Sequence, residues 1–417
     1  MDMWRNKRLR VLLWLILGMP LAGAWGQAPN SCLDCHSVLD APLQVTPEQF
    51  SRDVHSQKGL DCASCHGGDP KKTDMEAMAK GAGFRGKIQR SQIPGLCGHC
   101  HSDGAYMRQF NPSLRTDQLS QYVTSVHGKL LAKGDVKVAV CTDCHGVHDL
   151  RAPRNAQSKV YPLNIAQTCA RCHANAAYMK GHAIPTDQFA KYSASVHHEA
   201  LAVRGDLSAP TCTTCHGNHG AAPPGVGSVQ NVCSTCHVFQ DQMFEKSTHK
   251  AAFQAASLPG CIVCHSNHDI SHPTDAKLGT GPQSVCSQCH TPGDDCDQAT
   301  KEMLSGLTRL NGAIQEADRI LGVAESSGME VSEARLEEDQ AHDSLTKARV
   351  TIHSFRKDLV EQDIEAGLKI AAKNVQAGKD ALKERDYRRM GLGFSLVAIA
   401  AVVLGLWLYI RKTEQTA

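Results

Sequence analysis

Residues 121–148 read QYVTSVHGKLLAKGDVKVAVCTDCHGVH, and residues 191–219 read KYSASVHHEALAVRGDLSAPTCTTCHGNH. Both stretches contain an aromatic residue, a His five positions later, the motif Cys-x-x-Cys-His, and another His three residues after that motif. Two such similar segments in one chain indicate an internal repeat, which has to be interpreted before any single residue. The motif that they share decides what kind of fold the chain adopts.

The Cys-x-x-Cys-His motif occurs nine times and accounts for 18 of the 19 cysteines. Zinc sites pair Cys-x-x-Cys units without needing a His after each one, and a disulfide scaffold would not keep the same two-residue gap nine times. Covalent haem attachment explains the pattern, because two thiols form thioether bonds with one porphyrin and the adjacent imidazole binds its iron. The sequence therefore predicts nine haem c groups, bonded to Cys32, Cys35, Cys62, Cys65, Cys97, Cys100, Cys141, Cys144, Cys169, Cys172, Cys212, Cys215, Cys233, Cys236, Cys261, Cys264, Cys286 and Cys289.

The same motifs provide a proximal iron ligand for every haem. The 259 residues from Cys32 to His290 leave about 29 residues per haem, too few to bury an ordinary core. Aromatic residues make up only 5% of the chain, so we expect the porphyrins themselves to form the interior. The proximal ligands are His36, His66, His101, His145, His173, His216, His237, His265 and His290.

Aligning the motifs gives one leading haem at Cys32 and four two-haem repeats, at about 49–110, 121–180, 191–240 and 243–296. Six-coordinate electron-transfer haems need a second axial ligand. Histidines at fixed places in the repeat are the best distal candidates, although the first repeat has Asp69 where the others have a His after their first motif. These candidates are His55, His127, His148, His197, His219, His249 and His268, with His182 and His272 for the remaining two haems.

The other histidines fit a ligand role less well. His99 lies inside a Cys-x-x-Cys loop, and His198 stands beside His197. His342 and His353 are three helical turns apart and share a helix face, from which they could reach a haem, but surface exposure is the favoured interpretation.

A sulfur-bearing residue follows the second haem His of every repeat by six positions. Met107, Met179 and Met243 are interpreted as packing against the porphyrin, with axial ligation as the alternative. Cys296 takes this place in the last repeat, and a free thiol, an intermolecular link and an unusual ligand all remain open for it.

The first 24 residues are typical of a secretory signal peptide. Lys7, Arg8 and Arg10 precede the short apolar stretch 11–18, and residues 22–24 (AGA) offer a small-residue cleavage site. An uncleaved N-terminal anchor is the alternative. Export agrees with haem attachment, which takes place outside the cytoplasm in bacteria.

Residues 391–410 form a second apolar run of 20 residues without a charge. A helix of that length covers about 30 Å, the thickness of the hydrocarbon layer. Basic residues flank it at 388–389 and 411–412. We expect a transmembrane helix followed by a cytoplasmic tail at 411–417, with a buried soluble helix as the alternative.

Residues 297–389 lack the haem motif, and their apolar residues recur at helical spacing from Leu304 to Leu321 and again from about Val331 to Arg385. Ser326, Ser327 and Gly328 interrupt the pattern. The simplest interpretation is a helical hairpin or stalk of two antiparallel helices, the second of which could continue into the membrane span.

The arrangement from Cys32 to Cys296 resembles the class III cytochromes c and the doubled-CxxCH multihaem proteins. The resemblance implies a mostly α/irregular, haem-filled nonahaem domain at 28–296, with bis-His haems stacked in close contact. The helices after the last haem look somewhat like the helical end of octahaem hydroxylamine-oxidoreductase-type proteins, in architecture alone. Membrane anchoring is similar to that of the tetrahaem quinol dehydrogenases, although those anchor at the N-terminus, which puts direct quinol oxidation in doubt.

The number of histidines is sufficient to close all nine iron sites, and no CxxCK variant, which marks the active haem of pentahaem nitrite reductases, is present. We therefore expect an electron-transfer protein rather than an enzyme. It would lie on the periplasmic side of the bacterial inner membrane and relay respiratory electrons between a quinol-linked donor and periplasmic or extracellular acceptors. The net charge of +2 gives no indication of nucleic-acid binding.

Two alternatives to this function stay open. One is a reductase of small nitrogen or sulfur oxyanions at one five-coordinate haem, and the first repeat, with Gly67, Gly68 and Asp69 after its motif, is the weakest point in the ligand set. The other is a structural or assembly subunit of a larger respiratory complex.

Overall fold

The computed structural model describes residues 30–223 and 225–416, so the predicted signal peptide lies outside the described residues. Every regular element within these ranges is a helix, and they contain no strand, which confirms the mostly α/irregular fold expected from the sequence. The chain divides into two compact bodies. One comprises the chain up to Thr168 together with His219–Ala221, and the other comprises Cys169–Asn218 and the chain from Ala222 onward.

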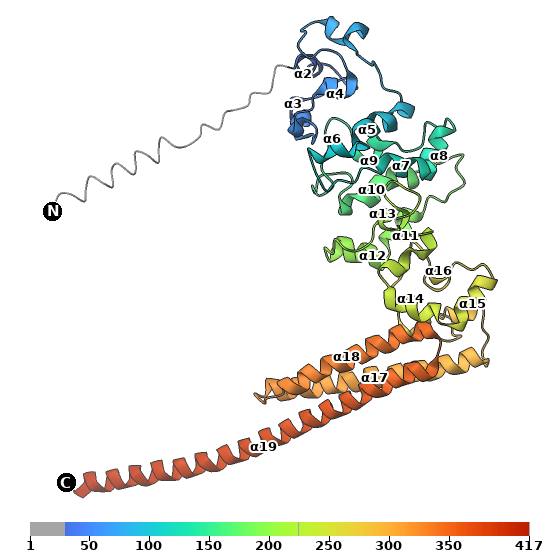
Figure 1. Ribbon diagram of the computed structural model, residues 1–417. Helices are drawn as coiled ribbons and strands as arrows, with labels where there is room; N and C mark the ends of the chain where they lie inside the picture. The colour runs from blue at the N-terminus through green and yellow to red at the C-terminus, as the bar shows by residue number, and fades with distance from the viewer. Residues whose placement is uncertain (1–29, 224, 417) are drawn as a thin grey trace, which may run out of the picture. The chain divides into compact units, whose positions relative to one another are not determined.

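The first body consists of short helices and turns joined by loops (Figure 1). In chain order the elements are α2 (Ser31–His36), α3 (Pro47–Arg52), η1 (Ser56–Lys58), α4 (Cys62–His66), η2 (Met75–Met78), η3 (Lys80–Ala82), η4 (Arg90–Gln92), α5 (Ile93–His101), α6 (Gly104–Arg108), α7 (Gln118–Thr124), α8 (Val126–Ala132), α9 (Cys141–His145) and α10 (Pro162–His173), whose last turn belongs to the second body. Five of these elements, α2, α4, α5, α9 and α10, contain a haem motif, and the longest α-helices here begin with a proline in their first turn.

The second body begins in the same style and ends in long helices. Its short elements are α11 (Gln188–Ser193), α12 (Val196–His198), η5 (Glu199–Val203), α13 (Cys212–His216), η6 (Val229–Thr235), α14 (Val238–Glu245), α15 (Thr248–Ala255), α16 (Cys261–His265), η7 (Asp275–Lys277) and η8 (Cys286–Gln288). Three long helices follow, α17 (Asp295–Ser326), α18 (Ser332–Thr351) and α19 (Lys357–Thr416), with η9 (Ile352–Ser354) between the last two.

The long helices differ from the predicted two-helix hairpin. The periodic stretch after Val331 is divided at residues 352–355, where Phe355 adopts a left-handed conformation with φ 55° and the chain reverses direction. The apolar spacing continues on both sides of this break, which is why periodicity alone predicted one helix. We call residues 295–385, in which α17, α18 and the first part of α19 lie side by side, the helical module (Figure 1).

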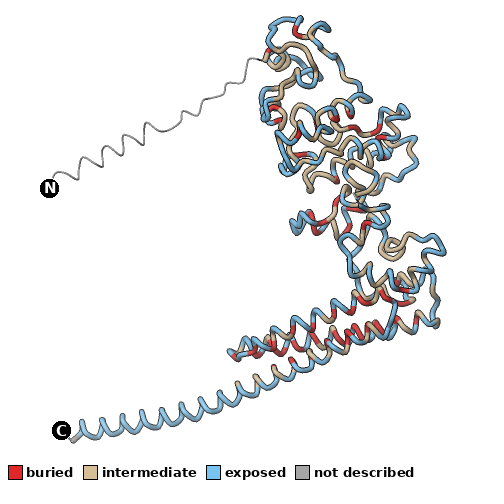
Figure 2. Tube along the Cα trace, viewed as in Figure 1, coloured by how far each residue is buried: buried red, intermediate tan, exposed pale blue. Residues whose placement is uncertain are grey.

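Buried side chains gather in the helical module, while the haem-motif segments contain few of them (Figure 2). Leu307, Leu310 and Ile314 of α17 pack with Leu345 of α18 and Ile364 of α19 in a continuous apolar cluster. The segments around the motifs bury mainly small residues, as expected for a domain in which porphyrins take the place of apolar side chains.

Helix α19 continues well beyond the module. The helix contains a stretch of mean hydropathy 2.3, long and apolar enough to cross a membrane, and none of that stretch is buried (Figure 2). Because 20 uncharged residues that are exposed to water would be strongly unfavourable, this part of α19 is a candidate membrane span.

Candidate haem-binding sites

The first haem motif of each repeat folds as a single turn of helix, in α4, α9, α13 and α16. Residues at positions i, i+3 and i+4 of a helix lie on the same face. The turn therefore presents both thiols and the proximal imidazole to one side, where a single porphyrin can bind all three.

Local hydrogen bonds determine where these turns begin and end. Asp61 Oδ1 accepts a hydrogen bond from Ser64 N at 3.0 Å, and Asp61 N donates to Ser64 Oγ at 3.1 Å, which caps the turn that starts at Cys62. Gly67 follows the haem His with φ 68°, and a Cβ atom there would lie 2.1 Å from the carbonyl oxygen of Gly83. Only glycine fits this position, so the helix ends directly after its iron ligand.

The distal-candidate histidines have their own repeated support. Ser125, Ser195 and Ser247 each stand two residues before one of these histidines, and each serine hydroxyl both caps the helix that carries the His and donates to the carbonyl of the aromatic residue three positions earlier. The hydroxyls of Tyr122 and Tyr192 donate to Ala139 O and Pro210 O, both at 2.9 Å, just before the next haem motif. The complete repeat pattern is therefore aromatic-x-x-Ser-x-His. The serine is the part of this pattern that the sequence analysis did not identify.

The first repeat replaces this serine with a buried carboxylate. Asp53 accepts hydrogen bonds from His55 N at 2.8 Å, from His55 Nδ1 at 3.2 Å and from Leu150 N at 2.9 Å. Burial acts to raise the pKa of Asp53, but the hydrogen bonds from His55 and Leu150 outweigh it and lower the pKa below its ordinary value. Asp53 thus positions His55 and also the loop that contains His148.

Seven proximal imidazoles face a second imidazole at nearly the same separation. The ring centroids are 5.8–6.3 Å apart in all seven pairs. With metal–nitrogen bonds of about 2 Å and ring centres about 1 Å further back, two axial imidazoles on one iron stand about 6 Å apart. The pairs are His55 with His101, His66 with His148, His145 with His219, His197 with His237, His216 with His268, His249 with His290, and His265 with His353.

The pairing follows two rules. The proximal His of a second motif is paired with the His that follows the aromatic residue of its own repeat, as in His101 with His55. The proximal His of a first motif is paired with the post-motif His of the following repeat, as in His66 with His148. Asp69 therefore leaves no gap at the haem of His66, which is paired with His148. By the same rule, the post-motif His that the first repeat lacks would serve the leading motif.

Burial favours the neutral form of several of these imidazoles, which is the form that binds a metal. Burial lowers the pKa of His145 to about 4, and it also lowers the pKa values of His66, His101, His216 and His265. The paired rings and the adjacent thiols therefore fit haem c in spacing, donor type and charge.

Sulfur atoms of neighbouring repeats also meet. The sulfur of the first Cys of a second motif lies close enough to that of the first Cys of the following repeat to shift its pKa, in the pairs Cys97 with Cys141, Cys169 with Cys212, and Cys233 with Cys261. Haems attached at such pairs of cysteines would have their edges close together, as electron transfer between them requires. This contact agrees with the close haem stacking that the family resemblance implies.

The other three distal candidates, His127, His182 and His272, have different surroundings. Burial lowers the pKa of His173, and His182 lies close enough to lower it further. His127 is the second residue of α8, directly comparable with His197 in α12. His272 is exposed and bonds only its neighbour Pro273 O, at 3.3 Å, which does not support it as a distal ligand.

His353 corrects the expectation that it would be exposed. Its ring lies 6.0 Å from that of His265 with 20° between the two planes, and it is partly buried. His342, its companion on the helix face, is exposed and pairs with Asp318 at 3.5 Å. His99 is exposed, and His198 packs edge-on against Tyr192, so neither adopts a ligand arrangement.

The leading motif differs from the others. His36 Nδ1 donates to Leu43 O at 2.8 Å, which leaves Nε2 for the iron. No imidazole of residues 30–223 and 225–416 forms with His36 a pair of the kind described above.

The sulfur-bearing residues after the second motifs have different surroundings. Met107 is buried, in keeping with a packing role. Burial and the neighbouring Cys286 raise the pKa of Cys296 to about 11, which favours the protonated thiol at neutral pH.

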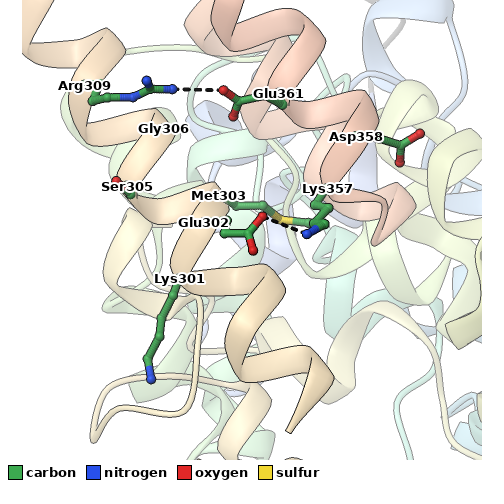
Figure 3. Close-up of a pocket in the computed structure, with 9 residues that line it drawn as sticks. All are labelled: Lys301, Glu302, Met303, Ser305, Gly306, Arg309, Lys357, Asp358 and Glu361. Carbon is green, nitrogen blue, oxygen red and sulfur yellow. Dashed lines mark hydrogen bonds and ion pairs between the residues drawn. The ribbon is translucent and has the colours of Figure 1, made fainter. Parts of the chain in front are cut away.

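A shallow groove between α17 and α19 has no feature of a haem site. Figure 3 shows that ion pairs cross it, with Arg309 bonded to Glu361 at 2.9 Å and Lys357 to Glu302 at 2.8 Å. Its charged side chains are mostly exposed and form ion pairs, which is typical of a solvated helix surface.

Comparison with known proteins agrees with the motifs. A family model described as cytochrome c3 matches residues 54–174. The C-type polyheme cytochrome OmcC of Geobacter sulfurreducens is 26% identical over 164 residues, which cover 34% of this chain and 20% of that protein. The chain thus matches only about a fifth of the length of this relative. No solved structure matches the chain.

Proposed function

We propose that this multihaem c-type cytochrome carries nine haem c groups and is a membrane-anchored electron relay on the periplasmic side of a bacterial inner membrane. It takes electrons from a quinol-linked donor and passes them to periplasmic or extracellular acceptors. Each haem is a one-electron carrier, and the polypeptide determines its spacing and potential rather than any bond chemistry.

The observation that carries this proposal is the pairing of imidazoles across the proposed iron sites. A catalytic haem needs an open distal position, whereas an iron between two imidazoles has none. Seven sites have such a pair, and His182 stands near an eighth proximal ligand. A chain of closed, closely spaced sites favours electron transfer.

Helix α19 supports the choice of a protein donor over quinol itself. About 34 residues separate the start of α19 at Lys357 from the apolar run that begins at Gly391. At 1.5 Å per residue this is about 50 Å of helix between the turn beside the last haems and the membrane surface. The quinol-linked donor is therefore a redox protein that extends out of the membrane and docks on the haem domain.

Purified full-length protein in detergent tests the relay. Mass spectrometry is expected to find nine covalent haems, and a stoichiometric reductive titration is expected to consume nine electrons. Membrane vesicles with an active quinol-oxidising chain should reduce the protein, while a soluble quinol analogue alone should do so slowly. Sustained oxidation of the reduced protein by nitrite or sulfite, with turnover of the anion, would contradict the relay and favour a reductase.

A further inference from the structure

We propose that the helical module ends the haem chain in the way a further repeat would, with His353 as the distal ligand of the haem on Cys261, Cys264 and His265. This inference depends on haem attachment but not on the relay function. It gives the module a coordination role that the haem motifs themselves do not indicate.

The proximal His of a first motif is paired with an imidazole of the repeat that follows. His145 is paired with His219 and His216 with His268, each partner coming from the repeat that follows. No repeat follows the fourth, so His265 has no partner of this kind in the haem domain. The ring of His353 stands 6.0 Å from His265 with 20° between the planes, within the range of the other pairs.

The ring of His353 is oriented with one nitrogen bonded to the backbone. Its Nδ1 lies 2.9 Å from Val350 O, and because a carbonyl only accepts, Nδ1 is the protonated nitrogen. Nε2 therefore has the free lone pair that an iron requires. A hydrogen bond from the non-ligating nitrogen to a backbone carbonyl is the usual support for a metal-bound imidazole.

The turn that carries His353 is held in place by bonds on both sides. The hydroxyl of Thr351 donates to Asp363 Oδ2 at 2.6 Å in a buried bond, which joins the end of α18 to α19. Arg349 forms a two-pronged ion pair with Asp275 at 2.9 and 2.8 Å, which ties the same end to the haem domain. The turn is therefore attached on both sides, as precise ligation requires.

Phe355 extends the contact to the last haem. Its ring stacks on His249 with centroids 3.7 Å apart, and His249 is the ring paired with His290. Phe355 has φ 55°, an unfavourable conformation for an aromatic residue, and such conformations persist where the surroundings enforce them at functional sites. The turn thus contacts the axial ligands of the last two haems.

The start of α17 provides independent support. The thiol of Cys296 lies beside that of Cys286, in the place where the second motif of an earlier repeat meets the first Cys of the next. Asp294, which caps α17, also bonds His290 Nδ1 at 3.2 Å. The module therefore reproduces both contacts of a following repeat, the sulfur contact through Cys296 and the imidazole contact through His353.

The test replaces His353 in the full-length holoprotein and measures haem content and the spin state of ferric haem by low-temperature EPR. In His353→Ala, nine haems should be retained, one of them should change from low spin to high spin, and added imidazole should restore it. His342→Ala, in the same module but exposed, should keep the wild-type spectrum. A count of low-spin haems in His353→Ala equal to that of the wild type, or the same change in His342→Ala, overturns the proposal.

His353→Met covers the case in which the alanine variant does not assemble. A methionine ligand keeps the iron low-spin and raises its reduction potential. The expected result is one haem of raised potential among nine. A potential profile identical to that of the wild type overturns the proposal.

Discussion

Replacing Asp53 with Asn should raise the reduction potential of one haem. This carboxylate is only 3% exposed and accepts a hydrogen bond from Nδ1 of His55, whose ring is paired with His101. A carboxylate on the outer nitrogen of an axial imidazole increases the basicity of that ligand. It therefore favours ferric over ferrous iron and lowers the potential.

The size of the effect follows from the change in hydrogen-bond type. A hydrogen bond to a charged group contributes about 1.5–3 kcal/mol and a neutral one about 1 kcal/mol, so Asn weakens the interaction by about 1 kcal/mol. In a one-electron couple 59 mV corresponds to a tenfold change in the equilibrium constant, so the expected shift is about 40 mV upward. Loss of the negative charge itself acts in the same direction.

The assay is a redox titration of the full-length holoprotein, followed by EPR and visible absorption. Asp53→Asn and Asp53→Ser, the latter placing the residue that the other three repeats use, should each raise one haem potential of the nine. Asp74→Asn removes an equal charge from the same repeat at an exposed helix cap and should shift none. An unchanged profile in Asp53→Asn, or an equal shift in Asp74→Asn, would refute the reasoning.

Because seven iron sites are closed by paired imidazoles, cyanide should perturb the Soret absorption of at most two of the nine proposed haems; a response from three or more would contradict the pairing. Leu310→Ala should destabilise the helical module by about 3–4 kcal/mol, since the side chain is fully buried. Leu336→Ala, at a position 68% exposed, should change stability by less than about 0.5 kcal/mol, and chemical unfolding followed by far-UV circular dichroism compares the two. Hydrogen bonds from Lys301, Thr280 and Gly293 lower the pKa of Asp297 to about 2. Its contribution to stability should therefore be complete above about pH 4 and be lost as the pH falls towards 2. Asp297→Asn should flatten the acid side of the stability profile, and an unaltered profile would show that Asp297 is not the group responsible.

The covalent sites can be proposed from the sequence because each is local. Two thiols and an imidazole within five residues suffice to bind one porphyrin, and one helical turn such as Cys141–His145 brings them to a single face. The apolar part of α19 was predictable for a similar reason, since length and composition alone decide whether a helix can cross a bilayer.

The distal partners were only half predictable. The repeat identified which histidines belong to the set, but not that His148 serves a motif in the preceding repeat, because that choice depends on how consecutive repeats pack. Nor did any spacing place His353 against His265 or His272 on the surface. The break in the second periodic stretch was hidden as well, since the apolar pattern continues through the left-handed residue Phe355.

By itself, the sequence of this protein indicates where haem would be attached, which histidines would bind iron from the proximal side, and which helix is apolar enough for a membrane. Only the tertiary structure decided which distant imidazole faces seven of them and that the helical module contacts the imidazoles proposed to hold the last two haems. The physical reason is that covalent attachment needs only neighbours along the chain. The sixth iron ligand must instead come from a segment that folding brings across the porphyrin.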